Sequence, residues 1–135
     1  MAEADGYILR IASKQWVEQV FNMAAYYTSL PRKWKKGQTI LFMHKTNNGD
    51  AIIGYGIIET VYDKNELSDE EKSECEKYGW KKAIEFSYVI RFEKPLLVKE
   101  TFLKNTKLRG RYFHGLKLNK QQLQIIITQA EQLQH

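Results

Sequence analysis

A hairpin signature near the middle of the chain constrains the fold more than any other stretch. Two apolar runs, 39–46 and 51–62, flank the pair Asn48-Gly49. Asn-Gly is typical of a tight hairpin turn, because the central residues of that turn need positive φ angles. The second run is apolar at consecutive positions, which indicates that both of its faces are buried and that it forms a central strand. We therefore expect the chain to fold around a sheet whose strands are mostly antiparallel.

Three helices are expected from residues that cap helix N-termini. Ser13 precedes a run whose apolar residues recur at helical spacing. Ser68 and Glu71 form a capping box for a polar helix over 68–78, which has almost no apolar stripe and should lie outside the core. Asn119 begins the C-terminal helix with an Asn-x-x-Gln cap. The expected buried stripe of this last helix is Leu123, Ile126, Ile127, Ala130 and Leu133.

The other strands and loops follow from alternation and from breaker residues. Residues 6–12 and 82–92 alternate apolar and polar side chains, as half-buried strands do. We expect the second of these strands to end at Pro95. Residues 26–37 are expected to form a polar, aromatic loop, and residues 108–118 another strand. Between these, the pattern predicts a short extended piece at 96–98 and a helical turn at 99–105.

This order of elements, β-α-β-β-(α)-β-(β)-β-α, predicts an α+β fold in a single domain spanning 1–135. The strands do not alternate regularly with crossover helices, so a doubly wound parallel sheet is not expected. A curled, mostly antiparallel β-barrel of five to six strands, with flanking helices at its openings, fits the order better.

The composition indicates an ordinary globular protein, with 43% hydrophobic and 27% charged residues. No apolar run approaches the roughly 20 residues that cross a bilayer, and the first residues lack the basic and apolar parts of a secretion signal. The single cysteine, Cys75, suits a reducing compartment, so we expect a cytoplasmic protein without a membrane partner. The histidines lack metal-ligand spacing, and no phosphate loop or nucleophile elbow is present. We expect no catalysis, no metal and no cofactor.

Charge is distributed unevenly along the chain. Residues 99–120 carry seven Lys or Arg against one acid, a net charge of +6, whereas residues 59–76 carry eight acids against two lysines, a net charge of −6. A second basic cluster with an embedded tryptophan, PRKWKKG, occupies 31–37. Such segregation describes the partners of a protein more than its fold, and the basic part favours a polyanion. Solvated surface charge is the alternative interpretation.

Four stretches together resemble the EVE domain, a branch of the PUA-like fold that also includes the YTH and ASCH domains. They are YILRIASKQW, KWKKGQTILFMHKTNNGDAIIGYGIIETVYD, WKKAIEFSYVIRFEKPLLVKE and KLRGRYFHGLKLNKQQLQII, which cover nearly the whole chain. The chain departs from the family at Gly37-Gln38, where Gly-Asp is common, and at Tyr7-Ile8, where an aromatic pair is common. The resemblance implies a pocket lined by aromatic residues that holds a nucleobase, often a modified one. It places Tyr26 and Tyr27 at the position of a pocket tryptophan.

Candidate binding residues follow from the residues and from the resemblance together. On a strand, Arg109, Arg111 and Phe113 would share one face. Arginine grips phosphate and an aromatic ring stacks on a base, although Phe113 is equally well placed for the core. The pocket walls are expected from Tyr26 or Tyr27 and from Trp34, with Thr28 or His44 as polar contacts, whereas Trp16 is expected in the core. The full candidate set is Tyr26, Tyr27, Thr28, Arg32, Lys33, Trp34, His44, Arg109, Arg111 and Phe113.

These residues favour a non-catalytic module that binds nucleic acid, RNA rather than DNA. In this interpretation the basic surface binds phosphates and the aromatic pocket binds a base, which can be a modified one. Two alternatives stay open. One is a small-molecule or nucleotide-binding regulatory domain that uses the same pocket, and the other is a protein-interaction module that docks through the acidic helix at 68–78.

Overall fold

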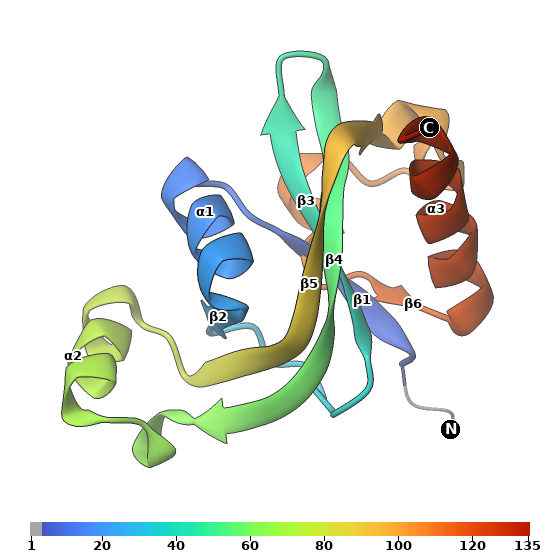
Figure 1. Ribbon diagram of the computed structural model, residues 1–135. Coiled ribbons are helices and arrows are strands. Elements are labelled where there is room, and N and C mark those ends of the chain that lie inside the picture. The colour runs from blue at the N-terminus through green and yellow to red at the C-terminus, as the bar shows by residue number, and fades with distance from the viewer. Residues whose placement is uncertain (1–3) are drawn as a thin grey trace.

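The computed structural model describes residues 4–135 and contains a six-stranded sheet with a helix on each face (Figure 1). The strands are β1 (Gly6–Arg10), β2 (Ala25–Thr28), β3 (Thr39–Thr46), β4 (Gly49–Asp63), β5 (Lys82–Leu97) and β6 (Lys117–Leu118). The α-helices are α1 (Lys14–Met23), α2 (Asp69–Tyr78) and α3 (Lys120–Leu133). The 3₁₀ turns are η1 (Lys64–Glu66), η2 (Val98–Glu100), η3 (Phe102–Asn105) and η4 (Gly110–Phe113). None of the helices in the described residues has the length and apolar character that a membrane span requires.

The sheet order is β2-β5-β4-β3-β1-β6, and the α+β expectation is confirmed. β1 and β3 are parallel, and the other neighbouring pairs are antiparallel. β4 and β5 contain 15 and 16 residues, and register shifts in their pairing bend them. The sheet curls, as expected, but the expected closure into a barrel is wrong, because the edge strands β2 and β6 do not pair with each other.

The two faces of the sheet carry separate cores. Leu9 and Phe42 belong to the core on the α1 side, whereas Ile8 and Leu41 belong to the core on the α3 side. This separation follows from the pleat, because successive side chains on a strand point to opposite faces. In Figure 1 the sheet is seen almost edge-on, with α1 on its left and α3 on its right. The apolar character of the central run 51–62 is thereby explained.

The helix caps are confirmed. Ser13, Ser68 and Asn119 each accept a backbone hydrogen bond at the start of a helix. The buried stripe of α3 is slightly narrower than expected. Leu123, Ile126 and Ala130 are buried, and Ile127 packs against them, but Leu133 lies in the last turn and is exposed.

β5 continues through Pro95, so the expectation that this proline ends the strand is wrong. Leu96 pairs with Ile52 of β4, and the preceding pair in the register is Arg91 with Gly54. The pairing is therefore interrupted between 91 and 96, and Pro95 lies in that interruption, where no ladder hydrogen bond needs its missing N–H.

Residues 25–28 form an edge strand, β2, beside β5, rather than the expected loop. Ala24 ends α1 in the left-handed conformation, with a φ of 52°, and its N–H donates to the carbonyl oxygen of Val20. The chain thereby reverses within one residue, and the following aromatic and β-branched residues suit a strand. The reversal places Tyr26 and Tyr27 on opposite faces of the sheet.

The expected strand at 108–118 is also wrong. Most of this stretch forms η4 and turns, and only Lys117–Leu118 is a strand. Gly110 has a φ of 53° and Gly115 a φ of 82°, and a strand requires negative φ angles throughout. The chain therefore turns at both glycines, and residues two apart in this stretch do not share a face.

Candidate functional site

Exposed cations gather on the segment that follows β5. Three of them, Lys99, Lys104 and Arg109, line a small cavity of about 160 Å³, which we call the basic cavity. Its apolar lining includes Leu103 and Phe113, both buried. This volume suits a phosphate group better than a nucleoside.

One carboxylate, Asp50, also lines the basic cavity, but it is already paired. The guanidinium of Arg10 donates to Asp50 Oδ1 through Nε at 3.2 Å and through Nη2 at 3.0 Å. Both side chains are mostly buried, so the pair is less screened than an ion pair on the surface. The three lysine and arginine side chains at the cavity therefore outweigh its single, neutralised acid.

A hydrogen bond connects the two basic segments of the sequence. Arg32 Nε donates to the carbonyl oxygen of Gly115 at 3.0 Å. The packing is close, because a Cβ on Gly115 would lie 2.7 Å from Arg32 Nη2. We use the name basic surface for the cations of these two segments, which are Arg32, Lys33, Lys99, Lys104, Lys107, Arg109 and Arg111.

His114 lies next to Gly115 in the sequence and makes a hydrogen bond to β1. Its Nδ1 accepts the backbone N–H of Arg10 at 3.0 Å, so the proton of the neutral ring is on Nε2. Burial lowers the pKa of His114, and the charges of Arg32 and Arg10 lower it further. The ring therefore stays neutral beside two guanidinium groups.

The aromatic ring presented by the basic surface is Tyr112, not Phe113. Tyr112 is 63% exposed, whereas Phe113 is 3% exposed and belongs to the core on the α3 side. The guanidinium of Arg111 lies 5.3 Å from the centroid of the Tyr112 ring. Phe113 does lie beside Arg109 in the lining of the basic cavity, but it is too deeply buried to offer a ring face to a base. The expected shared face of Arg109, Arg111 and Phe113 is wrong, because η4 replaces the alternation of a strand.

A second, larger cavity lies between α1, β2, α2 and the start of β5; we call it the aromatic cavity. Its volume is about 720 Å³, and its rings are Trp16, Tyr27 and Trp80. Tyr27 stacks on Trp80 with 5.2 Å between ring centroids, and Trp16 meets Trp80 edge-on at 5.0 Å. Trp16, which was expected in the core, packs against the core on the α1 side, but it is only half-buried and also lines this cavity.

Acidic side chains of α2 form the opposite wall. Asp69, Glu70, Glu71 and Glu74 line the cavity. Tyr27 Oη donates to Glu71 Oε2 at 2.9 Å. Burial, reinforced by this bond, raises the pKa of Tyr27 to about 12, and the same bond lowers the pKa of Glu71. Tyr27 is therefore a neutral donor and Glu71 an ionised acceptor at neutral pH.

The other expected pocket residues do not join Tyr27 in this cavity. Trp34 is buried, meets Tyr7 edge-on at 5.0 Å between centroids, and donates its indole N–H to the carbonyl oxygen of Leu30 at 3.3 Å. Tyr26 packs against the core on the α1 side, and burial raises its pKa to about 12. Thr28 is buried, and its Oγ1 accepts the N–H of Leu30 at 3.0 Å.

His44 lies at a separate cavity, of about 520 Å³, beside Arg91 and Glu93. Its Nδ1 lies 2.6 Å from the carbonyl oxygen of Ile11, so Nδ1 is the protonated nitrogen of the neutral ring. The expected grouping of Tyr26 or Tyr27 with Trp34 and His44 around one base is therefore wrong.

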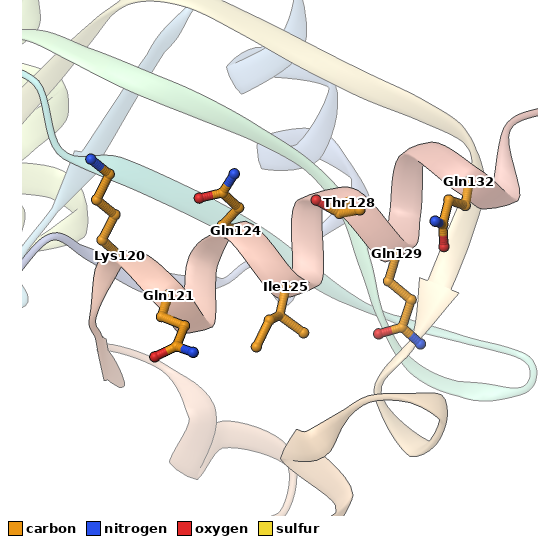
Figure 2. Close-up of a pocket in the computed structure, with 7 residues that line it drawn as sticks. All are labelled: Lys120, Gln121, Gln124, Ile125, Thr128, Gln129 and Gln132. Atoms are coloured by element: carbon orange, nitrogen blue, oxygen red, sulfur yellow. The ribbon is translucent and has the colours of Figure 1, made fainter.

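A depression of about 710 Å³ along the outer face of α3 has no comparable chemistry (Figure 2). All seven residues that line it come from this one helix, and Figure 2 shows their side chains spread along its length, with Lys120 and Gln124 pointing up in the view and Gln121, Ile125 and Gln129 pointing down. Four are glutamines, and the apolar contribution is the exposed Ile125. We interpret it as the solvated face of the helix.

Sequence reasoning missed Tyr112 and Trp80 as binding residues. Tyr112 lies two residues after Gly110, whose positive φ excludes a strand, and a turn placed at that glycine would have predicted an exposed Tyr112. Trp80 follows the C-cap glycine of α2, where an apolar ring commonly packs back on the helix it follows. In residues 4–135, no group of three or more His, Cys, Asp or Glu side chains is placed to hold a metal ion.

Comparisons with known proteins agree on the fold. No family model matches the chain, and no curated protein matches it in sequence. Three solved structures of the ASCH protein from Zymomonas mobilis are similar to it. A serine-to-alanine variant has a TM-score of 0.65 at 13% identity, covering 96% of this chain and 99% of its own. A tyrosine-to-phenylalanine variant has a TM-score of 0.60 at 12% identity, with 92% and 97% covered.

The third structure, described simply as ASCH, has a TM-score of 0.59 at 14% identity, covering 92% of this chain and 94% of its own. Nearly the whole chain is therefore superposable on nearly the whole of each neighbour. ASCH domains belong to the PUA-like superfamily. At this level of identity the likeness concerns the backbone alone, and it shows that the chain has the PUA-like fold seen in ASCH domains.

Proposed function

We propose that this protein is a non-catalytic RNA-binding module of the EVE type. In this proposal the basic surface binds the phosphates of a single strand, and the aromatic cavity takes one base. The observation that carries the proposal is the exposed Arg111–Tyr112 pair among the exposed lysine and arginine side chains of the basic surface. A ring and a guanidinium that lie in water give no packing energy to the fold, but they offer a stacking platform and a phosphate contact.

In this proposal the phosphates and the base bind at two different sites. The basic cavity is lined by Lys99, Lys104 and Arg109, and its volume of about 160 Å³ suits one phosphate. Arg32 adds a further cation to this region through its bond to the Gly115 carbonyl oxygen. Phosphate contacts position a strand, and base contacts give specificity.

The loop that follows β2 connects the aromatic cavity with the basic surface. Tyr27 lines the aromatic cavity, and only five residues later Arg32 reaches the basic surface. A single strand that lies on the basic surface along this loop would carry its bases toward the aromatic cavity.

Truncation of Tyr112 tests the proposal against a matched exposed ring. Tyr112→Ala should weaken binding of a short single-stranded RNA by about 1–3 kcal/mol, roughly five- to more than a hundredfold in Kd. The control is Tyr88→Ala on β5, which removes a ring that is 49% exposed but lies outside the basic surface. Fluorescence anisotropy with labelled RNA measures both. Equal affinities for the two variants would contradict the proposal.

A second candidate function is supported by the volume of the aromatic cavity. At about 720 Å³ it lies within the range of small-molecule sites, which supports a regulatory domain that binds a free nucleoside or nucleotide. Salt separates the two functions. RNA binding should weaken steeply as salt rises, because each neutralised phosphate releases counterions, whereas binding of a neutral nucleoside should hardly respond.

A further inference from the structure

The aromatic cavity has the opposite charge to the basic surface. Three rings, Trp16, Tyr27 and Trp80, share the cavity with the acidic wall of α2, and no Lys, Arg or His of the described chain is among the residues that line it. Carboxylates in the wall of a cavity repel a phosphate that enters it. The cavity is therefore suited to a base and not to the backbone of the strand.

The rings are held in place before any ligand enters. Tyr27 is fixed from two sides, by the stack on Trp80 and by its hydrogen bond to Glu71 at 2.9 Å. Trp80 is stacked a second time, on Tyr78, with 4.6 Å between centroids. Side chains that are already ordered lose little entropy on binding, so the contacts they make contribute almost fully to affinity.

Tyr78, which stacks on Trp80 but does not line the cavity, has a cation of the protein over its ring. The ammonium group of Lys77 lies 5.3 Å from the centroid of the Tyr78 ring, which itself stacks on Trp80. Aromatic faces carry a negative quadrupole, and their attraction for a cation is strongest where water is excluded. The carboxylates of Glu70 and Glu74, one helical turn apart on α2, add a second attraction of the same sign.

The volume of the cavity favours a large, flat cation over a lone ammonium group. About 720 Å³ exceeds the space that a lone ammonium group fills, and it suits a flat base with its ribose. A neutral base gains only from stacking on the rings. A base with a formal positive charge gains from stacking, from the ring quadrupoles and from the carboxylates together.

We propose that the aromatic cavity selects a nucleobase made cationic by alkylation of a ring nitrogen, such as 7-methylguanine or 1-methyladenine. The inference rests on the proposed function, since it names the class of base that the RNA-binding module takes in this cavity. The basic surface and the cavity then read different features of the strand, its phosphates and one charged base.

Calorimetry with free nucleosides tests the inference, because nucleosides carry no phosphate and do not need the basic surface. We expect 7-methylguanosine to bind about tenfold more tightly than guanosine, and 1-methyladenosine about tenfold more tightly than adenosine. Glu74→Gln, which keeps the shape of the wall and removes one charge, should reduce this preference several-fold, because a neutral amide attracts the charge of the alkylated base less than a carboxylate does.

The matched control is Glu76→Gln, two residues along the same helix. Glu76 does not line the cavity and pairs with Lys64 at 3.7 Å on the surface, so its loss should leave the preference unchanged. These substitutions remove only exposed charge, so both variants are expected to fold.

Three results would overturn the inference. The first is equal affinity for the charged and neutral nucleosides, and the second is an equal effect of the two glutamate substitutions. The third is that the cavity binds a peptide containing trimethyllysine and does not bind 7-methylguanosine, which would assign the cavity to a protein partner. None of these results touches the binding of RNA phosphates by the basic surface, which fails separately if unmodified RNA binds Tyr112→Ala as tightly as it binds the parent protein.

Discussion

Gly115 joins the two halves of the basic surface, and its substitution by alanine gives the sharpest test of that packing. Gly115 has a φ of 82°, and an added Cβ would lie 2.7 Å from Arg32 Nη2 and 2.9 Å from Leu30 Cδ2. A left-handed conformation costs a residue with a Cβ about 1–2 kcal/mol. Displacement of Arg32 also breaks its hydrogen bond to the Gly115 carbonyl, a further 1–3 kcal/mol or so for a charged donor that is partly exposed.

Gly110→Ala is the matched control for this prediction. Gly110 is also left-handed, with a φ of 53°, but among the described residues nothing lies within 4 Å of the position of its Cβ. It should therefore show the conformational cost alone, about 1–2 kcal/mol. Urea unfolding measures both, and a difference of about 2 kcal/mol shifts the midpoint by roughly 1 M. Equal losses for the two variants would refute the packing of Arg32 on Gly115.

Three further predictions concern residues whose roles the structure has reassigned or defined. Trp34→Ala should lower the free energy of unfolding by about 3–5 kcal/mol, because it empties a buried site, while Trp34→Phe should cost much less; thermal unfolding compares them. Tyr26 and Tyr27 should ionise near pH 12, two units above ordinary tyrosines, in an absorbance titration that Tyr26→Phe simplifies. Because their folded pKa values are raised, their contribution to stability is complete below pH 10 and is lost as the pH rises through about 12. The folded pKa of His114 is instead lowered, chiefly by burial. The contribution of His114 to stability is therefore present above pH 6.5 and is lost as the pH falls through the lowered pKa. Urea unfolding of the parent and of His114→Gln at several pH values measures this loss.

Sequence patterns predicted the elements whose signals are local. The Asn48-Gly49 turn, the caps at Ser13 and Asn119 and the central apolar strand depend on neighbours within a few residues, and each is confirmed. The PUA-like fold was recognisable from the sequence because it was identified by the order of its elements, and each element has a local signal. Closure into a barrel was not, since it depends on whether two edge strands meet, and no single strand carries that information.

The prediction of the binding residues depended on which side chains of a strand share a face. That prediction failed where a glycine turns the chain and the strand is absent. Treating 108–118 as a strand selected Phe113, whereas Gly110 starts a 3₁₀ turn that buries Phe113 and exposes Tyr112. Tyr27 was identified, but its neighbours Trp16 and Trp80 come from elements 11 and 53 residues away. Long-range contacts of that kind come from tertiary packing, which periodicity does not encode.

The salt dependence of RNA binding tests the central claim most directly. Affinity for a short single-stranded RNA is measured at several salt concentrations for the parent protein and for Arg109→Glu/Arg111→Glu. If each arginine contacts a phosphate, the double reversal should weaken binding and reduce the slope of log K against log salt by about 1.4, or 0.7 per contact. The control, Lys77→Glu/Lys94→Glu, changes the net charge equally at exposed positions on α2 and β5. The account predicts a parental slope for that control, and an unchanged affinity and slope for the arginine reversal would contradict it.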